Sequence, residues 1–358
     1  MSMRQQFSQV LEKASMGSEL TKEDIVTLLQ ALPGEEEEQL FQLADKVRRE
    51  NHGDAVHLRG IIEFSNYCRN DCHYCGLRRS NKDLKRYRIP MEEIIEAARY
   101  AAALGYGTIV LQAGEDPYYS GEQLADMIRR VKEVGDFAVT VCVGERSRED
   151  YELMRKAGAD RYLLKHETAD PELFAQMRPG TSFEERIKRL NWLRELGFQV
   201  GSGNMIGLPG QTVETLAEDI LLLKELDVEM AGIGPFIPHH QTPLKDCGPG
   251  DLKLTLKALA VARLVLPLAH LPATTAVGTL HPEGRKLALS CGANVIMPNL
   301  SPATYRQMYQ IYPEKAGSKE DADESHERIT TLVKEMGRQI STGRGDSPKE
   351  HFKNGPAC

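Results

Sequence analysis

Residues 57–76 read HLRGIIEFSNYCRNDCHYCG, an apolar, strand-like run followed at once by three cysteines. Cys68, Cys72 and Cys75 are spaced C-x3-C-x2-C, and no fourth cysteine lies nearby. A [4Fe–4S] cluster normally takes one cysteine for each iron. Three thiolates would leave one iron open to an exogenous ligand, as in a catalytic metal site. The spacing therefore predicts chemistry at an open iron.

A zinc knuckle and a purely electron-transferring cluster are the alternative interpretations of this motif. Zinc sites usually combine a C-x2-C pair with a second pair of Cys or His residues. His73 lies inside the motif, where we expect its backbone to form part of the turn. The spacing favours the iron–sulfur interpretation with an open iron.

Composition narrows the class of protein. The 358 residues are enough for a substantial core in one large domain or two, and the net charge of −7 argues against a nucleic-acid partner. No apolar run approaches the roughly 20 residues of a membrane span, and the N-terminus lacks the apolar core of a signal peptide. We therefore expect a soluble, cytoplasmic protein without a membrane partner.

The cysteines outside the motif do not suggest a second site. Seven cysteines, widely scattered, are too few for a disulfide framework, so a reducing compartment is expected. Four of them have no partner at metal-ligand spacing and are interpreted as small buried or loop residues: Cys142, Cys247, Cys291 and Cys358.

Strand-like and helical patterns alternate through most of the chain. This alternation predicts an α/β fold, a complete (β/α)8 TIM barrel over residues 51–302, with an N-terminal helical extension (1–50) and a C-terminal helical extension (303–358). The charged segment 313–325 is expected to be a loop. The predicted strands are 57–65, 108–113, 138–143, 161–166, 198–206, 230–236, 272–277 and 294–298. The clearest predicted helices are 91–104, 121–134, 183–196 and 212–226.

Polar residues cluster at the carboxyl ends of these strands, where barrel enzymes place their active sites. The cysteine motif follows the first strand, and Gly114 and Glu115 follow the second. Glu167 and Arg186 are a complementary pair for a zwitterionic ligand, although a rim ion pair would look the same. The basic stretch 78–88 is either a solvated surface or a contact for an anionic substrate or a partner.

The cysteine motif, with Tyr74 before its third cysteine, resembles the signature of radical S-adenosylmethionine (SAM) enzymes. More specifically, the chain from about residue 57 to 313 closely resembles the HydE family, the radical SAM maturases of [FeFe]-hydrogenase. The segments that carry this resemblance are 75–79, 84–88, 110–119, 161–168, 207–212, 232–239, 272–276 and 292–299.

The resemblance implies which residues form the site. Cys68, Cys72 and Cys75 would bind one [4Fe–4S] cluster, whose open iron would hold SAM. The positions implied for cofactor binding are Gln112, Gly114, Glu115, Thr140, Glu167, Arg186 and Met205. A long internal cavity would be lined by Arg59, Thr274, Thr275 and Tyr312, with Gln112 and Thr140 also facing it. No catalytic acid–base residue is identified.

The resemblance also implies the reaction and the partners. Reductive cleavage of SAM would give a 5′-deoxyadenosyl radical that acts on an iron dicarbonyl cyanide cysteine complex delivered by the companion maturase HydG. Transient contacts with HydG, with HydF and with an electron donor are expected. Many family members carry extra cysteines after the Tyr-Pro that corresponds to Tyr312 and Pro313, but this chain has none there. A single cluster is therefore expected.

Three alternative functions remain open. A radical SAM mutase of the methylornithine synthase type would share the architecture. A biotin-synthase-like enzyme would need ligands for a second cluster, and no second cysteine group supplies them. A non-enzymatic iron–sulfur carrier or scaffold belongs to a different class, which SAM cleavage would exclude.

Overall fold

The computed structural model describes residues 2–353, so Cys358 lies outside the described part. The strands of the main sheet are hydrogen-bonded in the order β10-β1-β2-β3-β4-β5-β7. Outside this order, β9 pairs with His57 and Leu58 of β1. All of its ladders are parallel. Its strands are β1 (Ala55–Ser65), β2 (Thr108–Ala113), β3 (Ala138–Cys142), β4 (Arg161–Leu163), β5 (Gln199–Ser202), β7 (Met230–Ala231), β9 (Val295–Ile296) and β10 (Gln339–Ile340).

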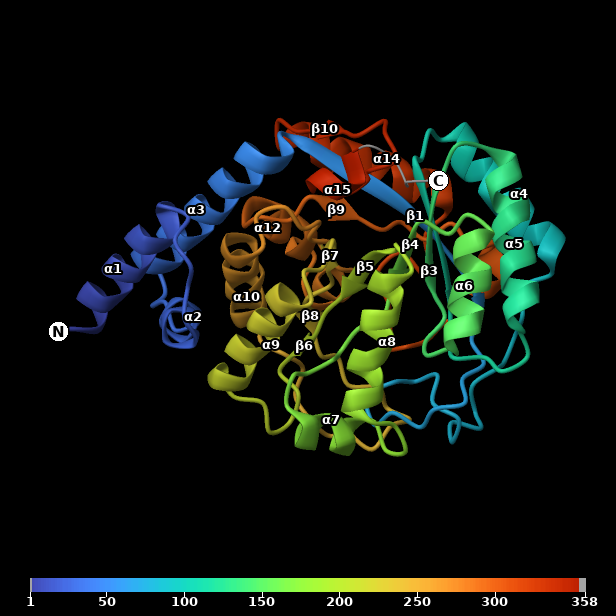
Figure 1. Ribbon diagram of the computed structural model, residues 1–358, viewed down its shortest axis with the longest axis horizontal. Coiled ribbons are helices and arrows are strands. Elements are labelled where there is room, and N and C mark those ends of the chain that lie inside the picture. Colours follow the sequence, from blue (N-terminus) through green and yellow to red (C-terminus); the bar gives the residue numbers. More distant parts are fainter. Residues whose placement is uncertain (1, 354–358) are drawn as a thin grey trace.

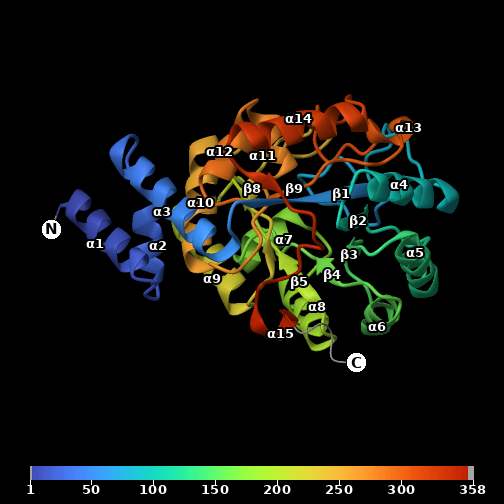
Figure 2. The ribbon, with the colours of Figure 1, turned by 90° about the horizontal axis from the view of Figure 1, so that it is seen from above.

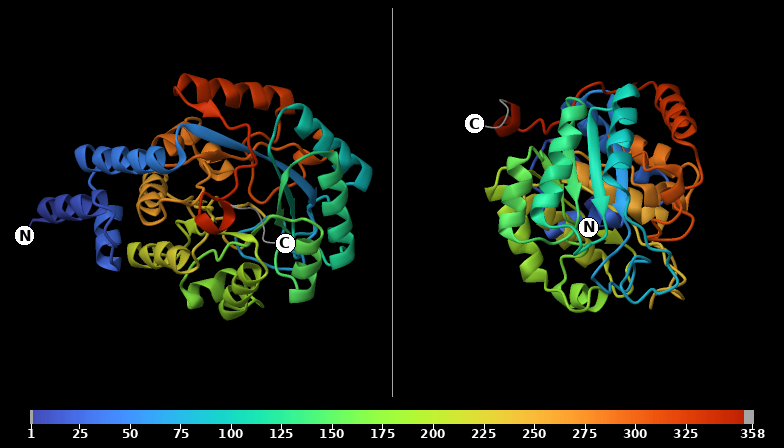
Figure 3. Two further views of the ribbon diagram at one scale, coloured as in Figure 1. Left: turned by 45° about the horizontal axis from the view of Figure 1, so that its top comes forward. Right: turned by 90° about the vertical axis from the view of Figure 1, so that its right-hand side faces the viewer.

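Helices follow the strands and cover the sheet (Figures 1 and 2). In the views of Figure 3, α4, α5 and α6 lie side by side. The helices that follow strands are α4 (Met91–Ala103), α5 (Gly121–Val134), α6 (Arg148–Lys156), α7 (Pro171–Met177), α8 (Phe183–Glu195), α9 (Val213–Glu225), α10 (Leu252–Val265), α11 (Thr275–Leu280) and α12 (Gly284–Ser290). The predicted helices 91–104, 121–134, 183–196 and 212–226 are confirmed to within a residue at either end.

Two predicted strands are interrupted in the middle. The expected strand 198–206 breaks after Ser202 and resumes as β6 (Met205–Ile206), and the expected strand 230–236 resumes as β8 (Gly234–Pro235). β6 and β8 form a separate two-stranded parallel sheet. Gly203 lies at the break, and a Cβ on it would lie 2.1 Å from the carbonyl oxygen of Gly232. Only glycine allows the two chains to pass this closely.

The prediction of a complete eight-strand barrel is confirmed only in part. The sheet is parallel and curled, but residues 272–277 form no strand. Isolated parallel bridges, Met230 with His270 and Pro272 with Val295, stand in its place. Pro272 has no N–H to donate to a ladder, and Thr274 caps α11, its hydroxyl accepting from Val277 N at 3.4 Å. The helix therefore begins where the strand was expected.

Helical segments precede and follow the main sheet in the chain. α1 (Met3–Ser15), α2 (Lys22–Leu29) and α3 (Glu35–His52) extend to one side (Figure 1). At the other end of the chain come α13 (Ala303–Arg306), α14 (Ala322–Glu335) and α15 (Glu350–Lys353). The loop predicted at 313–325 is too long at its end, because an Asp321 capping box starts α14 at Ala322.

Residues 341–347 cover the amino-terminal ends of the strands, opposite the cysteine loop. Arg161 Nη2, at the start of β4, donates to Asp346 Oδ1 and to the Arg344 carbonyl oxygen, both at 2.7 Å. The Thr108 hydroxyl, at the start of β2, donates to the same carbonyl at 2.8 Å. This C-terminal segment, like β10, was not anticipated from the sequence.

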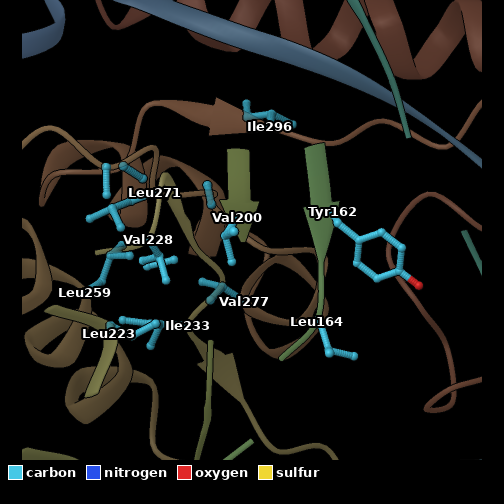
Figure 4. Close-up of a cluster of buried hydrophobic side chains, with 14 of the residues drawn as sticks. Tyr162, Leu164, Val200, Leu223, Val228, Ile233, Leu259, Leu271, Val277 and Ile296 are labelled. Carbon is cyan, nitrogen blue, oxygen red and sulfur yellow. The ribbon is translucent and has the colours of Figure 1, made fainter. Parts of the chain in front are cut away.

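The apolar core lies between the sheet and its helices. Figure 4 shows Val200, Val228 and Ile233 beside Leu223 of α9 and Leu259 of α10, all nearly inaccessible to solvent. Burial of each such side chain contributes about 1.5–3 kcal/mol. This packing fixes the strand ends from which the site loops project.

Candidate active site

The cysteine loop, residues 66–76, follows β1 and is held by three other segments of the chain. Arg69 N donates to the Glu115 carbonyl after β2, His73 N to Met177 O at the end of α7, and Gly76 N to Ile311 O, each at 2.9 Å. Because the backbone of the loop is anchored on several sides, its side chains are preorganised.

The three motif cysteines lie close together in this loop. Cys72 is buried, and Cys68 and Cys75 are half-buried. Burial raises the pKa of all three thiols, and the pKa of Cys75 is raised further by the neighbouring Cys72 and Cys68. The other described cysteines, Cys142, Cys247 and Cys291, are free, and burial raises the pKa of Cys142 to about 12. Within residues 2–353, no three His, Cys, Asp or Glu side chains converge on a site for a single metal ion.

Gly114 and Glu115 brace the cysteine loop. A Cβ on Gly114 would lie 2.2 Å from the carbonyl oxygen of Tyr67, so glycine permits the close approach of the two segments. The Glu115 carboxylate accepts from Arg69 Nε at 2.6 Å, from Asn70 Nδ2 at 2.9 Å and from Glu145 N at 3.0 Å. These contacts link the loop to the ends of β2 and β3.

Two arginines of the basic stretch 78–88 form hydrogen bonds within the protein that hold neighbouring loops together. Arg86 donates to the carbonyl oxygens of Asn66, Leu77, Arg78 and Asn81. Arg88 makes two hydrogen bonds to Asp116, at 2.7 and 2.9 Å. Arg79, Lys82 and Lys85 are the exposed cations of the stretch. The interpretation of this stretch as only a solvated surface is therefore wrong for Arg86 and Arg88.

Arg178 is a site residue that the sequence did not reveal. It is buried, and its Nη1 donates to the Tyr74 hydroxyl at 3.0 Å. Its positive charge opposes the effect of burial on the pKa of Cys72. Arg178 lies in no recognisable motif, and only the folding of α7 against the cysteine loop brings it there.

Glu167 and Arg186, the complementary pair expected to hold a zwitterionic ligand, each form an ion pair with another residue. Arg186 Nε lies 2.8 Å from Glu145 Oε1, and its Nη1 donates to Lys165 O at 3.0 Å. Its Nη2 is buried without a hydrogen-bond partner among the described residues. Glu167 has a left-handed backbone (φ 69°) and a carboxylate 3.7 Å from Lys165 Nζ. A buried, unpaired guanidinium N–H is costly, so it marks a place for an acceptor.

A buried polar network supports the turn at Glu167. Asp219 of α9 accepts from Ala169 N at 2.5 Å and from Asn204 Nδ2 at 2.9 Å, and lies 3.6 Å from His166 Nε2. The other ring nitrogen of His166 lies 3.0 Å from the Ser202 hydroxyl. The network ties the ends of β4 and β5 to α9. No sequence pattern indicated this network, because its members are far apart along the chain.

The remaining predicted residues come from several different elements of the fold. Arg59 and Thr140 line an enclosed cavity of about 10 Å3. Arg59 Nε and the Thr140 hydroxyl are both buried without a hydrogen-bond partner among the described residues. Gln112, Met205 and Tyr312 are half-buried, and Thr274 and Thr275 start α11. The long internal cavity implied by the resemblance remains a prediction.

Comparisons with known proteins agree with this geometry. Residues 62–223 match the model of the radical SAM superfamily. The [FeFe] hydrogenase maturase subunit HydE of Thermotoga maritima is 54% identical over 307 residues, which cover 86% of this chain and 88% of that protein. The 3-methylornithine synthase of Methanosarcina acetivorans is 31% identical, with 97% of this chain and 96% of that protein covered.

A crystal structure of methylornithine synthase has the same fold. It superposes with a TM-score of 0.83 at 28% identity and covers 93% of this chain and 97% of its own. A three-cysteine loop at the mouth of a curled parallel sheet, together with these matches, defines a radical SAM enzyme. Within that superfamily, which implies a [4Fe–4S] cluster and SAM, the chain belongs to the HydE family. Among residues 2–353, no helix has the length and apolar character needed to span a membrane.

Proposed function

We propose that Cys68, Cys72 and Cys75 bind one [4Fe–4S] cluster and that the enzyme cleaves SAM reductively during assembly of the [FeFe]-hydrogenase active site. The observation that carries the proposal is the position of the three thiols, in one loop anchored at the carboxyl edge of the sheet near an unpaired buried Arg186 N–H. The 54% identity to a HydE maturase supports the biological role.

The donor set fits the cofactors. Three thiols from one loop suit a cubic cluster with an open iron. When bound, the cluster would supply the electron that splits SAM into methionine and a 5′-deoxyadenosyl radical. The unpaired Nη2 of Arg186 would donate to the SAM carboxylate. Glu167, presented by its left-handed turn, would accept from the SAM ammonium.

Other residues would orient SAM and shield it from water. Glu115 already accepts three hydrogen bonds that fix the cysteine loop, so its main contribution would be to hold the cluster ligands in place. Gly114 would let the backbone approach the cofactors, and Gln112, Thr140 and Met205 would complete the binding surface. Arg178 would place a positive charge beside the cluster thiolates.

For the substrate we propose the iron dicarbonyl cyanide cysteine complex supplied by HydG, with HydF and an electron donor as further transient partners. The proposed barrel domain comprises residues 51–302, preceded in the chain by the helical extension 1–50 and followed by the helical extension 303–358. The substrate would occupy the inside of this domain and contact Arg59, Thr274, Thr275 and Tyr312. The isolated bridges of His270 with Met230 of β7 and of Pro272 with Val295 of β9 connect these two strands where the expected seventh strand is missing. They support a sheet that encloses an interior. The unpaired Arg59 Nε and Thr140 hydroxyl offer polar contacts inside it.

A mutase of the methylornithine synthase type is the second candidate, favoured by similarity over 97% of the chain. Complementation separates the two. An anaerobic host that lacks its HydE should recover hydrogenase activity when it expresses this chain, and a Cys72→Ala variant should not restore it. SAM cleavage in vitro without complementation would favour the mutase, and the absence of cleavage in a cluster-loaded protein would reject both.

A further inference from the structure

The side chain of Lys315, in the segment after Tyr312, extends to the inner face of the curled sheet. Its Nζ donates to Glu63 Oε1 at 2.5 Å and to Oε2 at 2.6 Å. The two side chains are only 6% and 4% exposed. From the sequence this segment was expected to be only a charged loop without cysteines, and the proposed function does not use the buried pair.

Glu63 points into the interior of the curled sheet. It lies in β1 two register positions beyond Ile61 and four beyond Arg59, which lines the enclosed cavity. Side chains at even spacing along a strand share a face, and Arg59 Nη1 reaches across to Met230 Sδ of β7 at 3.0 Å. Glu63 is therefore on the interior face, close to the carboxyl edge where β1 leads into the cysteine loop.

The segment that carries Lys315 also contacts the cysteine loop. Ile311 O accepts from Gly76 N, next to Cys75, at 2.9 Å. The Lys315 ammonium lies 4.9 Å from the ring centre of Tyr309. Residues 309–315 thus connect the proposed cluster site to Glu63, and the ion pair lies in the same interior as the proposed substrate.

The hydrogen-bonding capacity of the pair is not exhausted. An ammonium has three donors and a carboxylate about four acceptor positions. Lys315 makes two hydrogen bonds, both to Glu63, and Glu63 accepts one more, from Asn299 Nδ2 at 2.7 Å. Within residues 2–353 one ammonium N–H has no partner besides the face of the Tyr309 ring, and one carboxylate position is left over. A buried ion pair by itself adds little to stability, so this arrangement suits a ligand.

We propose that Lys315 and Glu63 form a subsite for the amino-acid part of the substrate. Lys315 donates to an α-carboxylate, and Glu63 accepts from an α-ammonium. The net charge of the subsite is zero, which matches a zwitterion and disfavours a simple anion or cation. The inference rests on the proposed function, because that function places a small substrate inside the sheet.

Binding of three small thiols to the cluster-loaded, full-length protein tests the subsite. Saturating SAM keeps the proposed open iron occupied, and anaerobic equilibrium dialysis measures affinity. The probes are L-cysteine, cysteamine, which lacks the carboxylate, and 3-mercaptopropionate, which lacks the ammonium. We expect saturable binding of L-cysteine that both analogues lose. Equal binding of all three probes, or no binding of L-cysteine, would overturn the proposal.

Variants then assign the contact. Lys315→Met and Glu63→Gln should each weaken L-cysteine binding at least about tenfold, the scale of one charge-assisted hydrogen bond. The matched control is Lys319→Met on the same segment, because Lys319 is exposed and pairs only with Glu314 at 3.7 Å. Unchanged L-cysteine affinity in Lys315→Met would reject the subsite.

The double variant Glu63→Gln/Lys315→Met separates binding from folding. It leaves no unpaired buried charge, so its thermal midpoint should recover relative to the single variants. L-cysteine binding should remain lost, and recovery of binding would make the pair merely structural. SAM affinity and SAM cleavage are followed in parallel. Loss of SAM cleavage in the wild type would contradict the proposed function, whereas the L-cysteine results judge the subsite.

Discussion

Arg186 of α8 and Glu145 after β3 form a buried ion pair, with 2.8 Å between Nε and Oε1. Within the described residues neither Nε nor Nη2 of Arg186 has a hydrogen-bond partner, so both N–H groups are open to an acceptor. Glu145 N in turn donates to the Glu115 carboxylate, which holds the cysteine loop. The proposed SAM contact and the proposed cluster loop are thus connected through two carboxylates.

Replacing Arg186 tests the SAM contact. Arg186→Ala should weaken SAM binding by about 1.5–3 kcal/mol, because a charge-assisted hydrogen bond is lost, while the cluster is retained. Anaerobic titration followed by electron paramagnetic resonance measures the affinity. Arg189→Ala is the matched control, since Arg189 also approaches Glu145, at 3.7 Å. Equal SAM affinity in wild type and Arg186→Ala would mean that Arg186 is only a structural ion pair.

The cysteines are tested by iron content and SAM cleavage. Cys68→Ala, Cys72→Ala and Cys75→Ala should each abolish cleavage, whereas Cys142→Ser, Cys247→Ser and Cys291→Ser should retain it. Reconstituted wild type should hold about four irons per chain, all lost in the triple variant, because one cube is expected. A second cluster signal that survives in the triple variant would contradict this prediction.

Gly114→Ala should disturb the cysteine loop without replacing a proposed cluster ligand, although the new Cβ would also lie 3.1 Å from Cys68 Cβ. The new Cβ would meet the carbonyl oxygen of Tyr67 at 2.2 Å, and overpacking of this kind costs about 1–3 kcal/mol. We expect most of the iron to be lost on anaerobic gel filtration. Gly248→Ala is the control, because nothing lies within 4 Å of a Cβ at that position. Full iron retention in Gly114→Ala would show that the loop can move aside.

Stability should fall in mild acid because of buried histidines beneath the sheet. Burial, with repulsion from Arg59, lowers the pKa of His57 from 6.5 to about 3, and burial lowers the pKa of His270 well below 6.5. Asp346 is the carboxylate that opposes the shift of His57. Between about pH 3 and 6.5 the unfolded chain binds protons that the folded chain does not, so the free energy of unfolding decreases as pH falls.

Urea unfolding at pH 7, 6 and 5 measures this slope. His270→Gln should show a shallower loss of stability than the wild type over the same range. The control is His281→Gln, since His281 is exposed. The idea would be wrong if His270→Gln lost stability with the wild-type slope.

The sequence alone determined the class of fold and the resemblance of the cysteine motif to the radical SAM signature. Apolar strands that alternate with amphipathic helices specify a parallel α/β sheet. The apolar strands are buried in the sheet, and each helix buries its apolar face against it. The spacing of Cys68, Cys72 and Cys75 is local, and so is the capping box of Thr21 and Asp24 that starts α2 at Lys22. Such features depend on neighbours in the chain and are legible without a structure.

The tertiary structure decided what depends on residues far apart in the chain. It replaced the expected seventh strand by a helix at Thr275, because Pro272 cannot donate to a ladder and Thr274 caps the helix. It placed Glu145, which no sequence pattern had linked to Arg186, within ion-pair distance of that guanidinium. It also brought Lys315 to Glu63, 252 positions apart in sequence. A buried charge must be paired with an opposite charge that the packed fold brings close to it. Residues close together in space can be far apart in the sequence, so no local sequence pattern predicts such a pair.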